Sequence, residues 1–340
     1  MKRIIISLLS FFAFLVVFNA CSTDVDLYAD YKDITVVYGL LDSGADTNFI
    51  KINKAFLGPG NAYDIALIDD SCNYHYKLDA KLIEYRASAL GNNYQKTNEF
   101  PLDTITVHNK ELGIFYAPDQ LVYYTTQKIK TNTSQYKYRY ELQINKGDTI
   151  ISATTDVVGG SSFSLTQGGY NFTIESDKVE WKPCPYAAIY EVVFKFYFTE
   201  VGPSHDSVVR CMTWPLGAYP ETQLTQNTQT GYYTLPFKPS MFFYKMSIFL
   251  GADTLKNVER LIFEPSMEVS ISAGGYELYN FITVNGPSNS IVQTLPEYTN
   301  VSDGYGVLSS RTMVKKRMKL MGNTIPELMQ RERWHFRQAG

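Results

Sequence analysis

The sequence predicts a mostly β protein with two tandem β-sandwich domains of immunoglobulin or fibronectin III type and a few short helices in the C-terminal half. Three observations support this prediction. The first two are runs of alternating apolar and polar side chains, over Tyr136–Asn145 and over Ile189–Thr199. A period of two indicates strands with one buried face. The third is the regular spacing of turn residues such as Lys146-Gly147-Asp148 between short strands, which is typical of antiparallel sandwiches.

The first predicted domain covers residues 33–157. Its clearest element is a hairpin that places Ile50 and Ile52 on one face and Lys51 and Asn53 on the other. The predicted strands and the short helix of this domain are Ile34–Leu41, Asn48–Lys54, the helix Ala62–Asp69 after the turn at residues 58–60, Lys77–Tyr85, Tyr136–Asn145 and Thr149–Thr155.

The second predicted domain covers residues 158–340, and Val158–Ser162 is the predicted linker that opens it. Ser240 and Thr324 are the predicted caps of two helices. The predicted strands are Val179–Trp181, Ile189–Thr199, Val208–Trp214, Arg260–Phe263, Met267–Ala273 and Tyr305–Leu320. The predicted helices are Met241–Leu250, Tyr276–Val284 and Ile325–Arg331.

Residues 1–20 have the pattern of an export signal that ends at a lipidated cysteine. The basic pair Lys2-Arg3 precedes the apolar run Ile4–Phe18, and the small residue Ala20 stands directly before Cys21. This order predicts cleavage before Cys21, a lipid on its sulfur, and a polar tether over residues 21–32. An ordinary leader with an incidental cysteine is the alternative. The run is too short for a stable membrane span, and no second apolar run of about 18 residues follows.

The cysteines and histidines indicate no metal centre and no cofactor. Beyond Cys21 the chain has Cys72, Cys184 and Cys211, an odd number that cannot pair completely within one exported chain. Either Cys184 and Cys211 form a disulfide within the second domain, or all three thiols are free. The four histidines are scattered and there is no C-x-x-C, so zinc-site spacing is absent.

The chain resembles a family of Bacteroidota lipoproteins that carry a domain of unknown function and are often encoded near TonB-dependent outer-membrane transporters. The resemblance rests on the leader and on the segments 35–41, 140–144, 151–155, 298–301 and 304–310. It covers nearly the whole mature chain and implies an envelope protein with two β-sandwich domains. The family has no established catalytic residues, so none are carried over.

Two smaller features agree with this resemblance. Asp24 and Asp26 follow the lipidated cysteine and are similar to the signal that sends such lipoproteins to the cell surface, although a merely polar tether has the same composition. Triplets of Asp, Ser or Thr, and an aliphatic residue resemble the O-glycosylation site of these bacteria. The candidate acceptors are Thr104, Thr149, Ser207 and Thr254. Because an attached sugar is bulky, glycosylation implies that these residues lie in surface turns.

Catalytic signatures are absent from the sequence, which predicts that the protein is not an enzyme. No G-x-S-x-G, H-E-x-x-H or phosphate-binding glycine loop occurs. His205-Asp206-Ser207 contains the residue types of a triad, but three consecutive residues cannot meet in triad geometry. A surface turn is expected there. Asp69-Asp70 is one alternative considered for calcium, although its loop lacks the oxygen spacing of a dedicated site. Asp42, Asp46 and Asn48 are the other residues that could gather around an ion.

Aromatic richness is the remaining functional clue, because the chain has 26 Tyr and 20 Phe. Tyrosine suits both sugar stacking and protein interfaces, although most of these residues alternate with polar ones and are expected in the core. The candidates for a binding surface near loops are Tyr123, Tyr124, Tyr219, Tyr232 and Tyr233. The formal charge of −3 gives no basic patch for nucleic acid.

These features together predict a non-catalytic outer-membrane lipoprotein that binds a nutrient or a partner protein at a transporter. A location on the cell surface is expected, with the periplasmic face as the alternative. Two other functions stay open. One is a fimbrial or adhesin-type subunit, which assembles by donating a strand to its neighbour. The other is a glycan or peptide hydrolase whose two carboxylates are far apart in the sequence.

Overall fold

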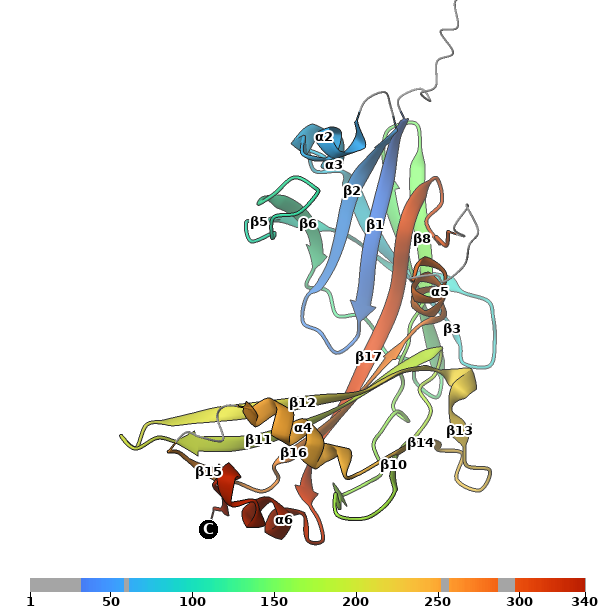
Figure 1. The fold of residues 1–340 in the computed structure, drawn as a ribbon. Helices are drawn as coiled ribbons and strands as arrows, with labels where there is room; N and C mark the ends of the chain where they lie inside the picture. Colours follow the sequence, from blue (N-terminus) through green and yellow to red (C-terminus); the bar gives the residue numbers. More distant parts are fainter. Residues whose placement is uncertain (1–31, 58–60, 252–256, 287–296, 340) are drawn as a thin grey trace, which may run out of the picture.

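The computed structural model describes residues 32–57, 61–251, 257–286 and 297–339. Strands make up 49% and helices 15% of the structure, and they form an upper and a lower module in the view of Figure 1. The predicted mostly β, sandwich-type fold is therefore confirmed. The predicted leader, the lipidation site Cys21, the acidic residues Asp24 and Asp26, and the glycosylation candidate Thr254 lie outside the described residues.

The N-terminal module packs two sheets face to face. Its strands are β1 (Lys32–Asp42), β2 (Asn48–Leu57), β3 (Asp79–Ser88), β4 (Gln95–Pro101), β5 (Asp103–Val107), β6 (Gln120–Thr125), β7 (Tyr136–Asn145) and β8 (Ile150–Asp156). β1, β2, β6 and β5 lie in one sheet, and β4, β3, β7 and β8 form the other. Val37 and Ile50 of the first sheet share a buried core with Leu82 and Leu142 of the second, as period-two alternation requires.

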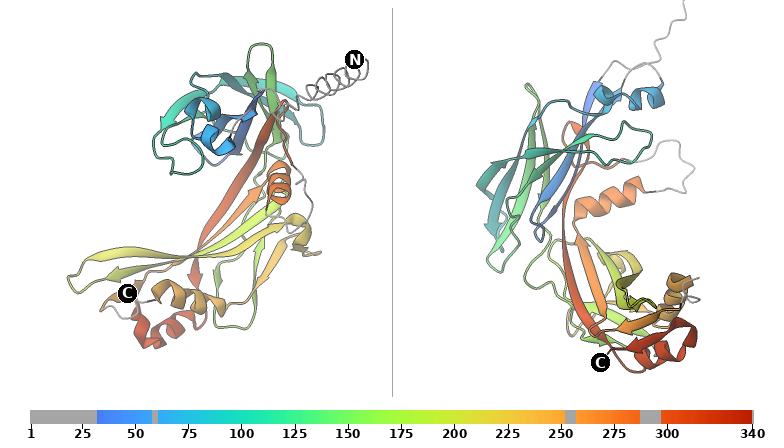
Figure 2. Two further views of the ribbon diagram at one scale, coloured as in Figure 1. Left: turned by 45° about the horizontal axis from the view of Figure 1, so that its top comes forward. Right: turned by 90° about the vertical axis from the view of Figure 1, so that its left-hand side faces the viewer.

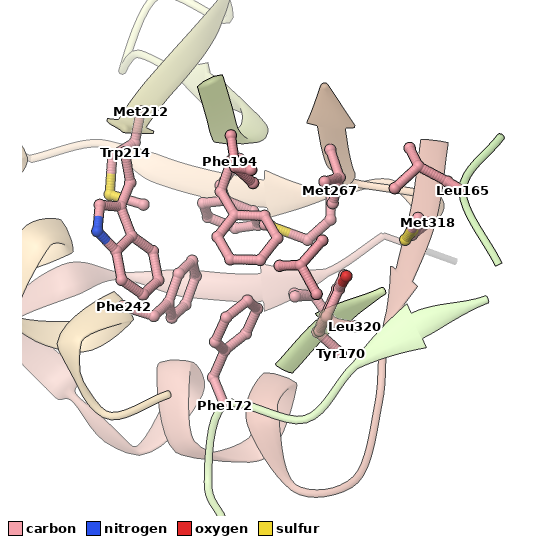
Figure 3. Close-up of a cluster of buried hydrophobic side chains, with 14 of the residues drawn as sticks. Leu165, Tyr170, Phe172, Phe194, Met212, Trp214, Phe242, Met267, Met318 and Leu320 are labelled. Atoms are coloured by element: carbon pink, nitrogen blue, oxygen red, sulfur yellow. The ribbon is translucent and has the colours of Figure 1, made fainter. Parts of the chain in front are cut away.

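The C-terminal module is built around one long, strongly aromatic strand. Its strands are β9 (Gly169–Tyr170), β10 (Asp177–Trp181), β11 (Ile189–Val201), β12 (Ser207–Pro220), β13 (Thr225–Gln226), β14 (Tyr233–Phe237), β15 (Glu259–Ile262), β16 (Met267–Gly274) and β18 (Phe336–Gln338). Phe194 and Phe196 of β11 are fully buried. Phe172 stacks on Phe242 with ring centroids 4.3 Å apart, and Figure 3 shows this pair in the buried cluster together with Phe194 and Trp214.

One strand, β17 (Gly304–Leu320), belongs to both modules. Its first half pairs in parallel with β1, from Thr35 opposite Gly304 onward, and its second half pairs antiparallel with β16. A single 11-stranded sheet therefore runs through the whole molecule, as the diagonal course of β17 in Figure 1 shows. Val301 and Leu308 complete the N-terminal core, although the sequence places them in the second predicted domain.

The predicted linker at Val158–Ser162 begins inside the protein. Val158 is fully buried, and its N–H donates to the hydroxyl of Ser310 at 2.8 Å. The Asn132 side chain donates to the carbonyl oxygens of Val157 and Gly159 at 2.6 and 3.0 Å. The crossing between the modules is thus held by β17 on one side and by the β6–β7 loop on the other.

Five α-helices lie within the described residues, and Figure 2 shows that they are peripheral to the sheets. They are α2 (Ala62–Ala66), α3 (Asp69–Cys72), α4 (Met241–Leu250), α5 (Tyr276–Asn285) and α6 (Thr324–Gln330), and two 3-10 helices cover Glu221–Gln223 and Glu332–Trp334. Ser240 precedes α4 but its side chain makes no capping bond. No helix in this described part of the chain is long and apolar enough to span a membrane.

The predicted cap of the last helix is wrong by one position. Asn323 is the N-cap of α6, and Thr324 is its first helical residue. The buried Thr324 hydroxyl instead donates to the Met321 carbonyl at 2.8 Å and accepts from the Phe172 N–H at 2.9 Å. The hydroxyl therefore joins the segment before β10 to the end of the chain rather than capping its own helix.

The disulfide alternative is not realised, because Cys72, Cys184 and Cys211 are all free thiols. Cys184 belongs to the aromatic core beside Tyr190. Cys211 pairs in the sheet with Tyr197, which alternates with the core-facing residues of β11 and therefore points to the opposite face. Tyr190, beside Cys184, and Tyr197, beside Cys211, are seven positions apart along β11, which corresponds to about 23 Å. The two thiols therefore cannot meet.

Candidate binding site

The tyrosines predicted to form a binding surface do not come together. Tyr123 is fully buried, and its hydroxyl accepts the Leu78 N–H at 2.7 Å. Tyr233 is also buried, and its hydroxyl contacts the Glu221 carboxylate. Tyrosine is favoured on the packed faces of strands, and β6 and β14 use it in that way.

The other three candidates are partly exposed, two of them in the C-terminal module and one in the N-terminal module. Tyr219 packs beside the C-terminal core and donates to the Leu216 carbonyl at 2.9 Å. The Tyr232 ring lies 5.9 Å from the ammonium of Lys182. Tyr124 lies in the N-terminal module, with its ring centroid 6.2 Å from that of Phe49.

The described glycosylation candidates differ in exposure. Thr149 is exposed in the β7–β8 turn, and Ser207 is exposed at the start of β12. Thr104 is partly buried within β5. Thr149 and Ser207 are therefore the accessible positions of the three.

The acidic groups considered for calcium already have partners. His75 contacts the carboxylates of both Asp69 and Asp70. The Asp42 carboxylate accepts from Arg311 at 3.1 Å. Asp46 lies 3.8 Å from Lys128. In the part of the chain that the structure describes, no three His, Cys, Asp or Glu side chains are placed to hold a metal.

A hollow on the outer face of β1 and β2 is the strongest candidate site. This face is turned away from the N-terminal core and lies toward the viewer in Figure 1, between α2 and α3 above and α5 at the side. A cavity of about 580 Å³ in the C-terminal module is larger. However, two of the charged side chains that line it, Glu259 and Arg337, neutralise each other at 2.9 Å.

The hollow, which we call the lysine pocket, has a volume of about 470 Å³, within the usual range of ligand sites. Its lining residues are Val36, Tyr38, Lys51, Asn53, Lys54, Ala55, Cys72, Lys110 and Phe115. Tyr38 pairs with Lys51 and Val36 with Asn53 across the two strands. The alternation that buries Ile50 and Ile52 therefore points the intervening side chains into the pocket.

The wall of the lysine pocket is held by contacts among α2, α3 and the loop between β5 and β6. The Tyr116 N–H donates to the Ala66 carbonyl at 2.9 Å, and the Cys72 thiol contacts the same oxygen at 3.3 Å. The Lys110 ammonium donates to the Tyr116 carbonyl. These bonds place Lys110 and Phe115, which are distant in sequence from β2, beside Lys51.

Three lysines give the pocket a positive charge. Among the described residues, no carboxylate forms an ion pair with Lys51, Lys54 or Lys110. Burial, followed by the nearby charge of Lys110, lowers the pKa of Lys51. The Lys54 ammonium lies 5.7 Å from the Tyr74 ring. An anion in the pocket would reduce the repulsion between these groups.

Asn53 contributes a buried acceptor with no partner. Its Nδ2 donates to the Cys72 carbonyl at 3.1 Å and to Asn73 Oδ1 at 2.8 Å, so the orientation of the amide is fixed by two acceptors. Its Oδ1 is buried and accepts no hydrogen bond from the described groups. Such an atom is rare in a folded protein, and because solvent does not reach it, a ligand in the pocket does not reach it either.

A second hollow adjoins the first at Tyr38, and we call it the helix pocket. It holds about 330 Å³ and is lined by Phe49, Leu278 of α5 and Val307 of β17, among others. α5 is fixed over β17 by Glu277, whose carboxylate accepts the hydroxyls of Thr155 and Ser309 at 3.2 Å each. The charged side chains that line this pocket, Asp42 and Arg311, pair with each other.

The Cys72 thiol that lines the lysine pocket is not an activated nucleophile. Burial raises the pKa of the Cys72 thiol, so the thiol stays protonated at neutral pH and is a poor nucleophile.

His205, from the triplet considered as a triad, has a positive φ of 66° in the β11–β12 turn, as expected for a surface turn.

The sequence indicates only part of this site. Alternation places Lys51 and Asn53 together on an outer face, but Lys110 and Phe115 come from a loop without periodicity. Their position depends on bonds to α2 and α3, which no local pattern reveals. Tyr124 contacts Phe49, which lines the helix pocket.

Comparisons with known proteins do not assign a family. No family model matches the chain, and no curated protein matches it. Among the solved structures that match is the crystal structure of CBD12 from CALX1.2, with 6% identity and a TM-score of 0.15. The alignment covers 84% of this chain and 99% of that chain. At this TM-score we draw no conclusion from the similarity.

Proposed function

We propose that the protein is a non-catalytic lipoprotein of the bacterial outer membrane, anchored through Cys21, that binds a nutrient or a partner protein beside a TonB-dependent transporter. The expected location is the cell surface. The observation that carries the binding function is the lysine pocket, in which three ammonium groups and two aromatic rings surround about 470 Å³. The anchor and the transporter rest on the leader and on the family resemblance.

The position of the pocket agrees with a tether at the N-terminus. β1 begins at Lys32, and the 11 residues from Cys21 to that point span at most about 40 Å. The N-terminal module would thus lie close to the membrane, with β1 and β2 near a neighbouring transporter. The protonated thiol of Cys72 supports binding rather than covalent chemistry at this site.

The fimbrial alternative has less support. A donated strand needs an open position beside a strand of the recipient sheet. β17 fills the position next to β1 with a segment of the same chain. This pairing gives the fimbrial function no support, and we do not propose it as a second function.

Three measurements test the proposed function. Labelled fatty acid should appear on the wild-type protein and not on Cys21→Ser, and only the wild type should fractionate with outer membranes. Cross-linking in intact cells should join the protein to an outer-membrane transporter, identified by mass spectrometry. A wild-type protein that incorporates no labelled fatty acid, or cross-linked partners that include no transporter, would contradict the proposal.

A further inference from the structure

We infer that the lysine pocket binds an acidic saccharide, whose anionic group lies between Lys51 and Lys110 and whose ring packs against Tyr38 or Phe115. The inference rests on the proposed binding function and adds the chemical class of the ligand. A uronate carboxylate and a sugar sulfate provide the same chemistry, which is a negative charge on a hydroxylated ring. Both are treated as sources of one ligand class.

The charge of the pocket favours an anion. Lys51 and Lys110 are close enough for the charge of one to lower the pKa of the other, and Lys54 lines the same hollow. Lysine holds an anion as a point charge without a fixed fork geometry, so a planar carboxylate and a tetrahedral sulfate are both accepted. Partial burial strengthens this attraction relative to an exposed lysine.

Aromatic side chains beside the lysines suit a pyranose ring. Tyr38 and Phe115 are 46% and 57% exposed, and a flat apolar ring packs well against the C–H face of a sugar. Tyr38 also lines the helix pocket, in which Phe49 is 53% exposed. The ion pair of Asp42 and Arg311 leaves that pocket without net charge, so it favours a neutral neighbouring sugar unit.

Isothermal titration calorimetry on the full lipoprotein in detergent, at low salt, tests the ligand class. The probes are methyl galacturonide, galactose 6-sulfate, neutral methyl galactoside, sodium acetate and a triglutamate peptide. We expect at least one acidic sugar to bind about tenfold more tightly than methyl galactoside and than acetate. Added salt should weaken this binding.

Matched substitutions locate the site. Lys51→Met and Lys110→Met should each weaken binding of the acidic sugar at least about fivefold, and circular dichroism should show an unchanged fold. Lys238→Met is the control, because Lys238 is an exposed lysine of the C-terminal module. It should bind the acidic sugar as the wild type does.

The outcomes separate this inference from the proposed function. Equal binding of neutral and acidic sugars, tighter binding of triglutamate, or full binding by Lys51→Met would overturn the acidic saccharide class. Lipid labelling and cross-linking to a transporter would still support the proposed function in that case. Tight binding of an acidic sugar by a protein that carries no lipid would instead overturn the proposed location and retain the ligand class.

Discussion

Lys51 shows how one residue of the site affects stability. Burial and the charge of Lys110 lower its pKa in the folded protein. The charged form of Lys51 therefore opposes folding. This cost is fully present below the folded pKa and disappears as the pH rises above the unfolded pKa, where both states are neutral. The residue is only partly buried, so solvent screening keeps the cost small.

Lys51→Met should therefore raise the free energy of unfolding at neutral pH, by less than about 1 kcal/mol after allowance for screening. Urea denaturation followed by circular dichroism measures the change. The gain should shrink at pH values above about 10, where the wild-type lysine loses its charge. Lys238→Met, at an exposed position, should leave stability unchanged at both pH values, and a destabilised Lys51→Met protein would contradict this account.

β17 is the element on which the arrangement of the modules depends. At its start the strand passes so close to β1 that a Cβ on Gly306 would lie 1.9 Å from the Val37 carbonyl oxygen. Gly306 also has a φ of 102°, which L side chains rarely adopt. Glycine at this position is required by both the close approach and the backbone conformation.

Gly306→Ala should lower the free energy of unfolding by more than about 2 kcal/mol, because it adds a steric overlap to an unfavourable backbone conformation. Gly113→Ala is a suitable control in the same module, because a Cβ on Gly113 would meet nothing within 4 Å and its φ is not positive. It should change stability by less than about 0.5 kcal/mol. Chemical denaturation of both variants measures the difference, and similar midpoints would refute the role of Gly306.

At the same scale, local patterns predict individual strands well and their partners poorly. The alternation over Tyr136–Asn145 matches β7, and Ile189–Thr199 lies within β11. The extended segment Tyr305–Leu320 is also predicted, but its parallel pairing with β1 joins residues far apart in sequence. Periodicity contains no information about such a pairing. β6 is missed because the pair Tyr123-Tyr124 is assigned to a loop surface.

The whole molecule has two hydrophobic cores joined by one sheet. The C-terminal core contains all three tryptophans of the chain, Trp181, Trp214 and Trp334. The N-terminal core contains Leu308 of β17, and the C-terminal core contains Met318 of the same strand. Because β17 is one continuous strand of both modules, unfolding that releases it from one module also disrupts the sheet of the other.

Unfolding should consequently be a single transition. Tryptophan fluorescence reports the C-terminal core, whereas far-UV circular dichroism reports both modules, and the two urea midpoints should coincide. Gly306→Ala, although it lies in the N-terminal module, should shift the fluorescence midpoint as well. A fluorescence transition that stays unchanged while circular dichroism shifts would mean that the modules unfold independently.

The late position of β17 in the chain also has a consequence for biogenesis. The sheet that begins at Lys32 receives its parallel neighbour only when residues 304–311 have been made. The part nearest the proposed lipid anchor therefore finishes folding last, and until then β1 exposes an unpaired edge that invites wrong association. A chaperone that holds the chain would protect it during this interval.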